Sequence, residues 1–149
     1  MDERQRDHAH VGEPIDERVR PTSILVAEDD PTLRELLAMI LREEGHTVMT
    51  VASADAMKLE LDRCGAHRTF DVLVTDIRMP GTSGLDVVAN LRAAGSTIPI
   101  IVMTAFPDDG VQERAVSLGA LLVAKPFSLA TICLAVDGLL ASHREEHAS

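Results

Sequence analysis

The stretch ILVAEDDPTLRELL at residues 24–37 decides the fold of this chain. It begins with a short apolar run, passes through three acidic residues and continues with leucines at helical spacing. A continuously apolar run of this length is typical of a parallel β-strand that is covered on both faces. Asp30 is suited to cap the following helix, and Pro31 suits its first turn, where a missing backbone N–H costs nothing. The stretch therefore predicts a strand that leads directly into a helix.

The same alternation continues through most of the chain. Four further apolar runs lie at residues 47–51, 72–75, 98–103 and 121–124, and helical patterns begin near residues 53, 83, 108 and 128. Five strands that alternate with five helices predict an α/β fold, a doubly wound (βα)5 three-layer sandwich with a parallel sheet. The second run alternates in polarity, so we expect it at a sheet edge.

Each helix is expected to bury one face. On the first helix this face is predicted to comprise four residues: Leu33, Leu36, Leu37 and Ile40. On the fourth it comprises Val111, Ala115 and Leu118, and on the fifth Leu129, Ile132, Cys133, Val136 and Leu140.

Length, composition and charge limit the class of protein. The 149 residues suit one ordinary domain, and a hydrophobic content of 46% is enough for a core. The formal net charge of −10 argues against direct nucleic-acid binding, which requires basic surfaces. No apolar run approaches the roughly 20 residues that span a bilayer, and the polar first residues do not resemble a secretory signal. Cys64 and Cys133 have no paired spacing and are predicted to be structural spectators, so the expected compartment is the cytoplasm.

The two ends differ in composition from the middle. Residues 1–21 and 143–149 are predicted to be tails, with one domain between them at 22–142. The histidines of these ends lack ligand spacing and predict no metal site: His8, His10, His143 and His147.

Polar residues follow four of the five apolar runs. Glu28 and Asp29 follow the first, Asp76 ends the third, Thr104 ends the fourth and Lys125 follows the fifth. The carboxyl ends of parallel strands share one edge of the sheet, where such folds bind ligands. Clustered carboxylates repel one another unless a hard divalent cation such as Mg²⁺ or Mn²⁺ binds.

This set of residues suits phosphoryl transfer. The cation and Lys125 would balance the charge of a phosphoryl group, Thr104 would donate a hydrogen bond, and an oxygen of Asp76 would attack phosphorus. Helix capping explains any single acidic residue equally well, but the ordered set favours a phosphoacceptor site on Asp76.

The segments that carry these residues resemble the receiver domain of two-component signalling. They are ILVAEDDPTLRELL at 24–37, VLVTDIRMPGTSGLD at 72–86, PIIVMTAF at 99–106, LGA at 118–120 and VAKPF at 123–127. The resemblance covers roughly residues 22–141, so the chain looks like a stand-alone response regulator or a piece of a longer protein. It implies a flavodoxin-like sheet with strand order 2-1-3-4-5.

The resemblance also implies residue roles. Asp76 is the phosphoacceptor, Thr104 the switch hydroxyl and Lys125 the partner of the phosphoryl oxygens. The implied Mg²⁺ ligands are Glu28, Asp29, Asp76 and the backbone carbonyl of Arg78. The Lys125–Pro126 bond is expected to be cis, and Pro80 and Gly84 are expected to shape the loop after Asp76.

Such domains are regulatory and catalyse only their own phosphorylation and dephosphorylation. The implied phosphoryl donor is a sensor histidine kinase or a histidine phosphotransfer protein, and the downstream protein target is not identified by the sequence. Kinases usually dock near the first helix, where Met39 lies off the buried stripe.

Three positions near the site differ from the usual pattern or vary within it. Leu122 stands where the family usually has an aromatic residue, three positions before the lysine, so the output face is expected to respond differently. Phe106 and Arg78 flank the site. A bulky Phe106 would hinder the hydrolytic water and Arg78 would reach the phosphate, which predicts a long-lived phosphoryl state.

The sequence leaves several functions open. The chain is alternatively an adaptor that works without phosphorylation, or an intermediate shuttle in a phosphorelay. A phosphatase of the haloacid dehalogenase type is disfavoured, because that family has a second Asp where this chain has Arg78. Finally, Val116, Leu122 and Leu134 predict an apolar patch on the fourth helix, fifth strand and fifth helix, with a homodimer as one candidate use.

Overall fold

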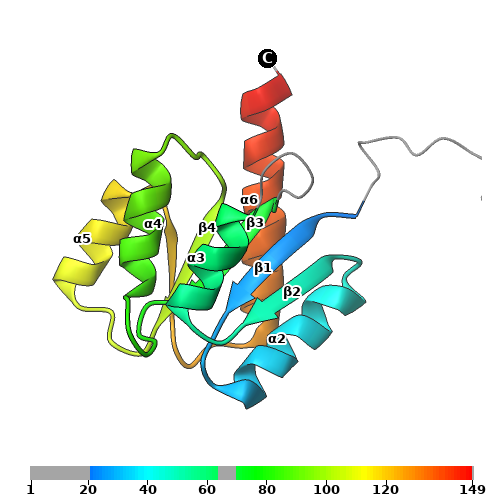
Figure 1. Ribbon diagram of the computed structural model, residues 1–149. Helices are drawn as coiled ribbons and strands as arrows, with labels where there is room; N and C mark the ends of the chain where they lie inside the picture. Colours follow the sequence, from blue (N-terminus) through cyan, green and yellow to red (C-terminus); the bar gives the residue numbers. More distant parts are fainter. Residues whose placement is uncertain (1–20, 64–69, 149) are drawn as a thin grey trace, which may run out of the picture.

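A parallel sheet between two layers of helices makes up the computed structural model, which describes residues 21–63 and 70–148 (Figure 1). The strands are β1 (Ser23–Ala27), β2 (Thr47–Val51), β3 (Val72–Asp76), β4 (Ile100–Thr104) and β5 (Leu121–Ala124). The helices are α2 (Pro31–Glu43), α3 (Ala54–Asp62), α4 (Gly84–Ala93), α5 (Asp109–Ser117) and α6 (Leu129–Ala148). The strand order is β2-β1-β3-β4-β5, so the predicted flavodoxin-like fold is confirmed and β2 lies at an edge.

The central strands are buried on both faces, which explains their unbroken apolar sequences. In β1, Leu25 and Ala27 belong to one core cluster, whereas Ile24 and Val26 belong to the other. Residues of α3, α4 and α5 contribute to the first cluster, and residues of α2 and α6 contribute to the second. Each central strand therefore supplies side chains to two cores, one on either face of the sheet.

The helices begin at the predicted caps. Side-chain oxygens of Asp30, Ser53, Ser83 and Asp108 accept backbone N–H groups at distances of 3.0, 3.0, 3.2 and 2.8 Å, respectively. The Ser128 hydroxyl accepts the N–H of Thr131 at 3.2 Å at the start of α6. These bonds satisfy N–H groups that have no partner inside the helix. They start each helix immediately after the loop that leaves the carboxyl end of a strand.

The buried face of α2 differs from the prediction at one position. Leu37 and Leu41 are fully buried, and Leu33 and Ile40 pack partly buried against the same cluster. Leu36, by contrast, is 40% exposed. The buried face is centred on the i, i+4 pair of Leu37 and Leu41. Leu36 precedes Leu37 by one position and is therefore rotated away from this face by about 100°. Leu36 thus contributes to a surface next to the carboxyl edge of the sheet. The inward residues predicted for α5 and α6 all contact their clusters.

The C-terminal helix is longer than predicted. The sequence favoured a tail from residue 143, whereas α6 continues to Ala148. Residues 139–148 contain no Gly or Pro, so none of them opposes continuation of the helix. Figure 1 shows the end of α6 projecting beyond the sheet. The predicted N-terminal tail and Cys64 lie outside the described residues, and the division into one domain with two tails stays a prediction.

Cys133 is buried within the cluster that α6 covers, in keeping with the structural role predicted for it.

Within the described ranges, no helix has the length and apolarity to cross a membrane.

Gly84 is predicted to be required for the junction of β3 and α4. A Cβ at this position would overlap the carbonyl oxygen of Asp76 and would lie 3.1 Å from the hydroxyl of Thr75. Gly84→Ala is therefore expected to lower the free energy of unfolding by about 1–3 kcal/mol, because the helix start must move away from the strand end. Urea denaturation followed by circular dichroism measures this change.

Gly138→Ala is the matched control. A Cβ at Gly138 meets no atom within 4 Å, and the residue lies in the middle of α6. This substitution is expected to raise the free energy of unfolding by roughly 0.5–1 kcal/mol, because Ala loses less backbone entropy in a helix than Gly. An undiminished stability of Gly84→Ala would contradict the close approach of residue 84 to the end of β3.

Candidate functional site

The residues that the sequence singled out lie at the carboxyl ends of four neighbouring strands. Glu28 follows β1, Asp76 ends β3, Thr104 ends β4 and Lys125 follows β5. The strand order makes β1, β3, β4 and β5 successive neighbours. Glu28, Asp76 and Thr104 are almost completely buried, with 0%, 5% and 2% of their surfaces exposed. The fold therefore collects these polar groups at one edge, largely shielded from water.

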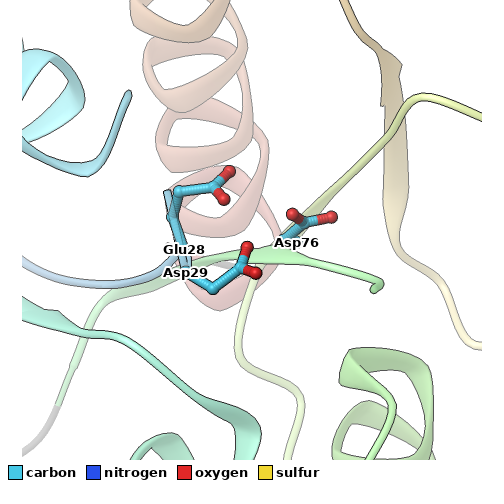
Figure 2. Close-up of side chains that lie close together, drawn as sticks. All are labelled: Glu28, Asp29 and Asp76. Atoms are coloured by element: carbon cyan, nitrogen blue, oxygen red, sulfur yellow. The ribbon is translucent and has the colours of Figure 1, made fainter. Parts of the chain in front are cut away.

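Three carboxylates form the acidic part of the site. Glu28, Asp29 and Asp76 each offer a carboxylate oxygen, and these oxygens lie within 4.8 Å of one another. Figure 2 shows the three side chains gathered where β1 and β3 end. Asp29 is exposed, so the cluster opens to solvent on its side.

Lys125 connects the two buried carboxylates. Its Nζ donates to Oε1 of Glu28 at 2.8 Å and to Oδ2 of Asp76 at 2.9 Å. The peptide bond between Lys125 and Pro126 is cis, as predicted. One ammonium group thus links the ends of β1, β3 and β5, which are far apart in the sequence.

The backbone after β1 is held by Arg34, a residue that the sequence did not single out. The guanidinium of Arg34 donates to the carbonyl oxygen of Glu28 at 2.9 Å and to that of Asp29 at 3.4 Å. The N–H of Asp30 donates to Oε2 of Glu28 at 3.1 Å. The sequence contained a signal for this role of Arg34. A positive charge is unfavourable at a helix N-terminus, and an arginine at the end of the first turn of α2 therefore suggests a specific partner.

The loop after β3 holds Asp76 from its own backbone. The N–H of Arg78 donates to Oδ1 of Asp76 at 3.2 Å. The buried hydroxyl of Thr75, which the sequence also did not single out, donates to the carbonyl oxygen of Asp76 at 2.9 Å. Both oxygens of the Asp76 carboxylate therefore accept a hydrogen bond, Oδ1 from Arg78 and Oδ2 from Lys125.

Thr104 is joined to the loop between β4 and α5. Its Oγ1 accepts the N–H of Phe106 at 3.0 Å, and its carbonyl oxygen accepts the N–H of Lys125 at 2.7 Å. Across the site, the guanidinium carbon of Arg78 lies 4.3 Å from the centre of the Phe106 ring. The sequence placed Arg78 and Phe106 beside the site, but only the structure shows that they stack.

Burial and like charge oppose ionisation of Glu28. Burial, with a smaller contribution from the charge of Asp76, raises the pKa of Glu28 from 4.5 to about 7, although bonds from Lys125 and Asp30 act in the opposite direction. Burial alone would lower the pKa of Lys125, but its hydrogen bonds to Glu28 and Asp76 outweigh this effect and raise it. The lysine is therefore a permanent positive charge beside a carboxyl that gains a proton easily.

The donor set fits a hard divalent cation. Three carboxylates with oxygen ligands suit Mg²⁺ in preference to softer metals, and two of them are already fixed by hydrogen bonds. A bound cation would offset the repulsion that Lys125 alone balances only in part. The acidic cluster is thus able to hold a metal ion.

A pocket of about 430 Å³ adjoins the site on the side of Lys125. Its lining is mainly apolar and comes from α2, the residue after Thr104 and the segment after β5: Leu33, Leu36, Ala105, Pro126 and Phe127, with Asp30, Thr32 and Lys125 as its polar members. The exposure of Leu36 is explained by its place in this lining. The pocket gives the site an apolar margin next to its charged centre.

Comparison with known proteins identifies similar sequences. Residues 24–137 match the family described as the response regulator receiver domain. The chain is 34% identical over 124 residues to the probable transcriptional regulatory protein TcrX of Mycobacterium tuberculosis, a match that covers 81% of this chain and 50% of TcrX. It is 38% identical over 122 residues to the transcriptional regulatory protein FixJ of Azorhizobium caulinodans, covering 81% and 56%. The chain thus spans about half the length of the curated relatives it matches.

Solved structures share the fold. The chemotaxis protein CheY4 of Vibrio cholerae superposes with a TM-score of 0.73 at 22% identity, over 81% of this chain and all of that one (100%). A CheY-like response regulator receiver domain protein from Methanospirillum hungatei gives a TM-score of 0.78 at 19% identity, over 85% and 99% of the two chains. At these identities the likeness concerns the fold alone.

The raised pKa of Glu28 predicts a pH dependence of stability in the absence of metal ions. The folded protein keeps the Glu28 proton up to about pH 7, whereas the unfolded chain loses it near 4.5. Between these values the folded state binds more protons, so the contribution of this carboxyl to the free energy of unfolding falls as the pH rises. Relative to Glu28→Gln, which does not titrate, the protein should lose on the order of 2 kcal/mol across this window.

Urea denaturation of both proteins in EDTA at several pH values measures this difference. Repeating the series with Mg²⁺ should remove much of the loss, because the cation favours the ionised carboxylate. Parallel pH profiles of the two proteins without metal would contradict the assignment of the raised pKa to Glu28.

Proposed function

Because the chain belongs to the response regulator receiver family, we propose that Asp76 accepts a phosphoryl group and that the new charge switches a protein-docking surface. The observation that carries this proposal is the position of Asp76, which contacts Lys125 inside the cluster with Glu28 and Asp29. The family is typically regulatory, so the product of the reaction is a changed state of the chain itself. Its relatives TcrX and FixJ are named as transcriptional regulatory proteins, which supports a signalling role.

The proposed reaction transfers phosphorus from nitrogen to oxygen. An Asp76 carboxylate oxygen attacks the phosphorus of a phosphohistidine, a P–O bond forms, and the electron pair of the broken P–N bond stays on the imidazole. Reversal to the resting state follows when water attacks phosphorus and releases inorganic phosphate. A bound Mg²⁺ supplies positive charge next to the phosphoryl oxygens.

The residues of the chain supply position and charge. The proposed Mg²⁺ ligands are Glu28, Asp29, Asp76 and the backbone carbonyl of Arg78. Lys125 already donates to Oδ2 of Asp76, so its ammonium is close enough to pair with a phosphoryl oxygen on that carboxylate. Thr104 supplies a hydroxyl whose hydrogen is available, because its oxygen acts as an acceptor toward Phe106.

A histidine kinase or a histidine phosphotransfer protein is the proposed donor. The donor must bring an imidazole to Asp76, so its surface has to contact the residues next to the site. The apolar pocket lined by Leu36, Phe127 and their neighbours offers a contact surface beside Lys125. Exposed Met39 on α2 extends the apolar surface of this helix. The same donors would serve a chain that acts as a shuttle in a phosphorelay.

An adaptor and a phosphatase would place different demands on the site. A phosphorylation-independent adaptor needs none of the contacts of Lys125, and Leu122 is the feature that favours it. A phosphatase of the haloacid dehalogenase type needs an Asp at the position of Arg78 and a nucleophile on the first strand, whereas Asp76 ends β3. The phosphoacceptor is favoured over both by the intact set of Glu28, Asp29, Asp76, Thr104 and Lys125.

The output face is proposed to be apolar in part. Val116 on α5 and Leu134 on α6 are 76% and 72% exposed. Leu122, which the sequence placed in the same patch, is half-buried and packs against the core cluster beneath α3, α4 and α5. The proposed surface for a homodimer or a target therefore consists of Val116 and Leu134 without Leu122.

Phosphorylation is tested with small-molecule donors. Incubation with Mg²⁺ and acetyl phosphate should add one phosphoryl group to the wild type, as measured by intact mass, and none to Asp76→Asn. Phosphoramidate, which carries a P–N bond as phosphohistidine does, should give the same adduct. Lys125→Ala should label at least about tenfold more slowly, because one preorganised positive charge is lost from the transition state.

Asp137→Asn is a matched control, because this exposed carboxylate lies on α6 away from the site. It should label like the wild type. An unlabelled wild type, under conditions that label another receiver, would support the adaptor and exclude the proposed function. Decay of the adduct after removal of the donor tests the predicted long-lived state, and a lifetime of seconds would contradict it.

Self-association is tested by charge introduction on the proposed face. If phosphorylation promotes a homodimer through Val116 and Leu134, the double variant Val116→Glu/Leu134→Glu should stay monomeric in sedimentation velocity while still forming the adduct. Leu59→Glu, an equally polar change at an exposed leucine of α3, is the control. A dimer that survives the double variant would place the interface elsewhere.

A further inference from the structure

This chain lacks the aromatic residue that usually takes part in the switch, and the residue in its place packs against the core. Leu122 replaces the expected aromatic residue, is half-buried and packs against the core cluster beneath α3, α4 and α5. An aliphatic side chain held in this way has no large exposed ring to reposition. A different group must therefore carry the change at Asp76 to the surface.

Four residues form a continuous chain of contacts from the end of β3 to the end of β4, namely Asp76, Arg78, Phe106 and Thr104. The N–H of Arg78 is bonded to the Asp76 carboxylate, and the N–H of Phe106 is bonded to the Thr104 hydroxyl. The side chains of Arg78 and Phe106 stack on each other at 4.3 Å. One cation–π contact thus joins the loop after β3 to the loop after β4. One of its members is hydrogen-bonded to Asp76 and the other to Thr104.

We propose that the Arg78–Phe106 stack is the readout of this receiver. It opens when Asp76 is phosphorylated, and the face of the Phe106 ring that Arg78 covers becomes exposed. This inference rests on the proposed function, because it needs a phosphoryl group on Asp76. It assigns Arg78 the role of the group that leaves the ring, and it gives the role of the missing aromatic residue to Phe106.

The guanidinium of Arg78 is the group that a phosphoryl charge attracts. Phosphorylation replaces a carboxylate of one negative charge by a group of nearly two, with three strong acceptor oxygens. The Arg78 backbone is already adjacent to Oδ1 of Asp76, so its guanidinium lies on the same loop as the new charge. A charge-assisted hydrogen bond to a phosphoryl oxygen is stronger than a cation–π contact at an exposed site. The guanidinium should therefore leave the ring for the phosphoryl group.

The second link runs through the hydroxyl of Thr104. Its oxygen is bonded to the N–H of Phe106, so any displacement of the oxygen toward Asp76 must stretch this bond or move the Phe106 backbone with it. The carbonyl oxygen of Phe106 accepts the N–H of Asp108 at 2.9 Å, and Asp108 caps α5. Movement at Phe106 is thereby passed to the start of α5.

Phe106 lies at the surface, where a change in its ring can be sensed. The residue is 56% exposed. In the resting state Arg78 covers one face of its ring with charge. Departure of the guanidinium therefore leaves this aromatic face next to the site without its charged cover.

Fluorine NMR of protein labelled with 4-fluorophenylalanine tests the proposal. The three resonances of Phe70, Phe106 and Phe127 are assigned by single Phe→Leu substitutions. Adduct formation with acetyl phosphate and Mg²⁺ is followed in the same sample by intact mass. The Phe106 resonance should move in proportion to the adduct, whereas the buried Phe70 should serve as an internal control that does not move.

Variants separate release of the stack from a direct field of the phosphoryl group. In Arg78→Ala the Phe106 resonance should already be displaced before phosphorylation, and its further change on adduct formation should fall severalfold. In Thr104→Ala the Phe106 shift per phosphoryl group added should be reduced, however slowly the adduct forms, and Thr104→Ser should restore the shift. An adduct with an unmoved Phe106, or an unchanged response in Arg78→Ala, would overturn the readout while leaving the proposed function intact. Absence of the adduct in the wild type would overturn both.

Discussion

The bond pair from Lys125 to Glu28 and Asp76 is the interaction on which the rest of the site depends. Two carboxylates that are almost completely buried share one ammonium group, at 2.8 and 2.9 Å. Removing one partner from such a group leaves a buried charge without compensation, which is far more costly than the loss of an exposed ion pair. Because Glu28, Asp76 and Lys125 lie at the carboxyl ends of β1, β3 and β5, the same bonds also hold three strand ends together.

In this arrangement the negative charges of the site outnumber its positive charge, at a cost in stability. One lysine faces three carboxylates, and the raised pKa of Glu28 expresses the cost of burying its carboxylate, with a smaller contribution from the charge of Asp76. A bound cation would relieve this cost, and the proposed phosphoryl group would alter the charge balance again. The close approach of Gly84 to the Asp76 carbonyl is a further constraint, because it permits α4 to start directly against the strand that carries Asp76. The parts of the fold that are most constrained are thus the ones that position Asp76.

The proposed transmission from the site depends on what the two flanking loops contact. The loop after β3 reaches Asp76 through Arg78, and the loop after β4 reaches Thr104 through Phe106. The stack of Arg78 on Phe106 connects these two loops, and Phe106 lies at the surface. Leu122 packs instead against core side chains. Under the proposed readout, the aromatic ring that responds to the charge on Asp76 lies in the loop after β4 instead of in β5.

The sequence by itself determined the local elements and named the residues that the fold brings together at the candidate site. Apolar runs, caps such as Asp30 and Ser83, and the order of Glu28, Asp76, Thr104 and Lys125 are local features, and each follows from a few neighbouring residues. Tertiary structure alone decided the paired bonds of Lys125, the hold of Arg34 on the backbone after β1, the exposure of Leu36 and the stacking of Arg78 on Phe106. These features join segments far apart in the chain and depend on side-chain rotamers and on the rotation of each helix about its axis. Periodicity defines a helix face only to within one neighbouring position, so spacing along the chain does not determine such contacts.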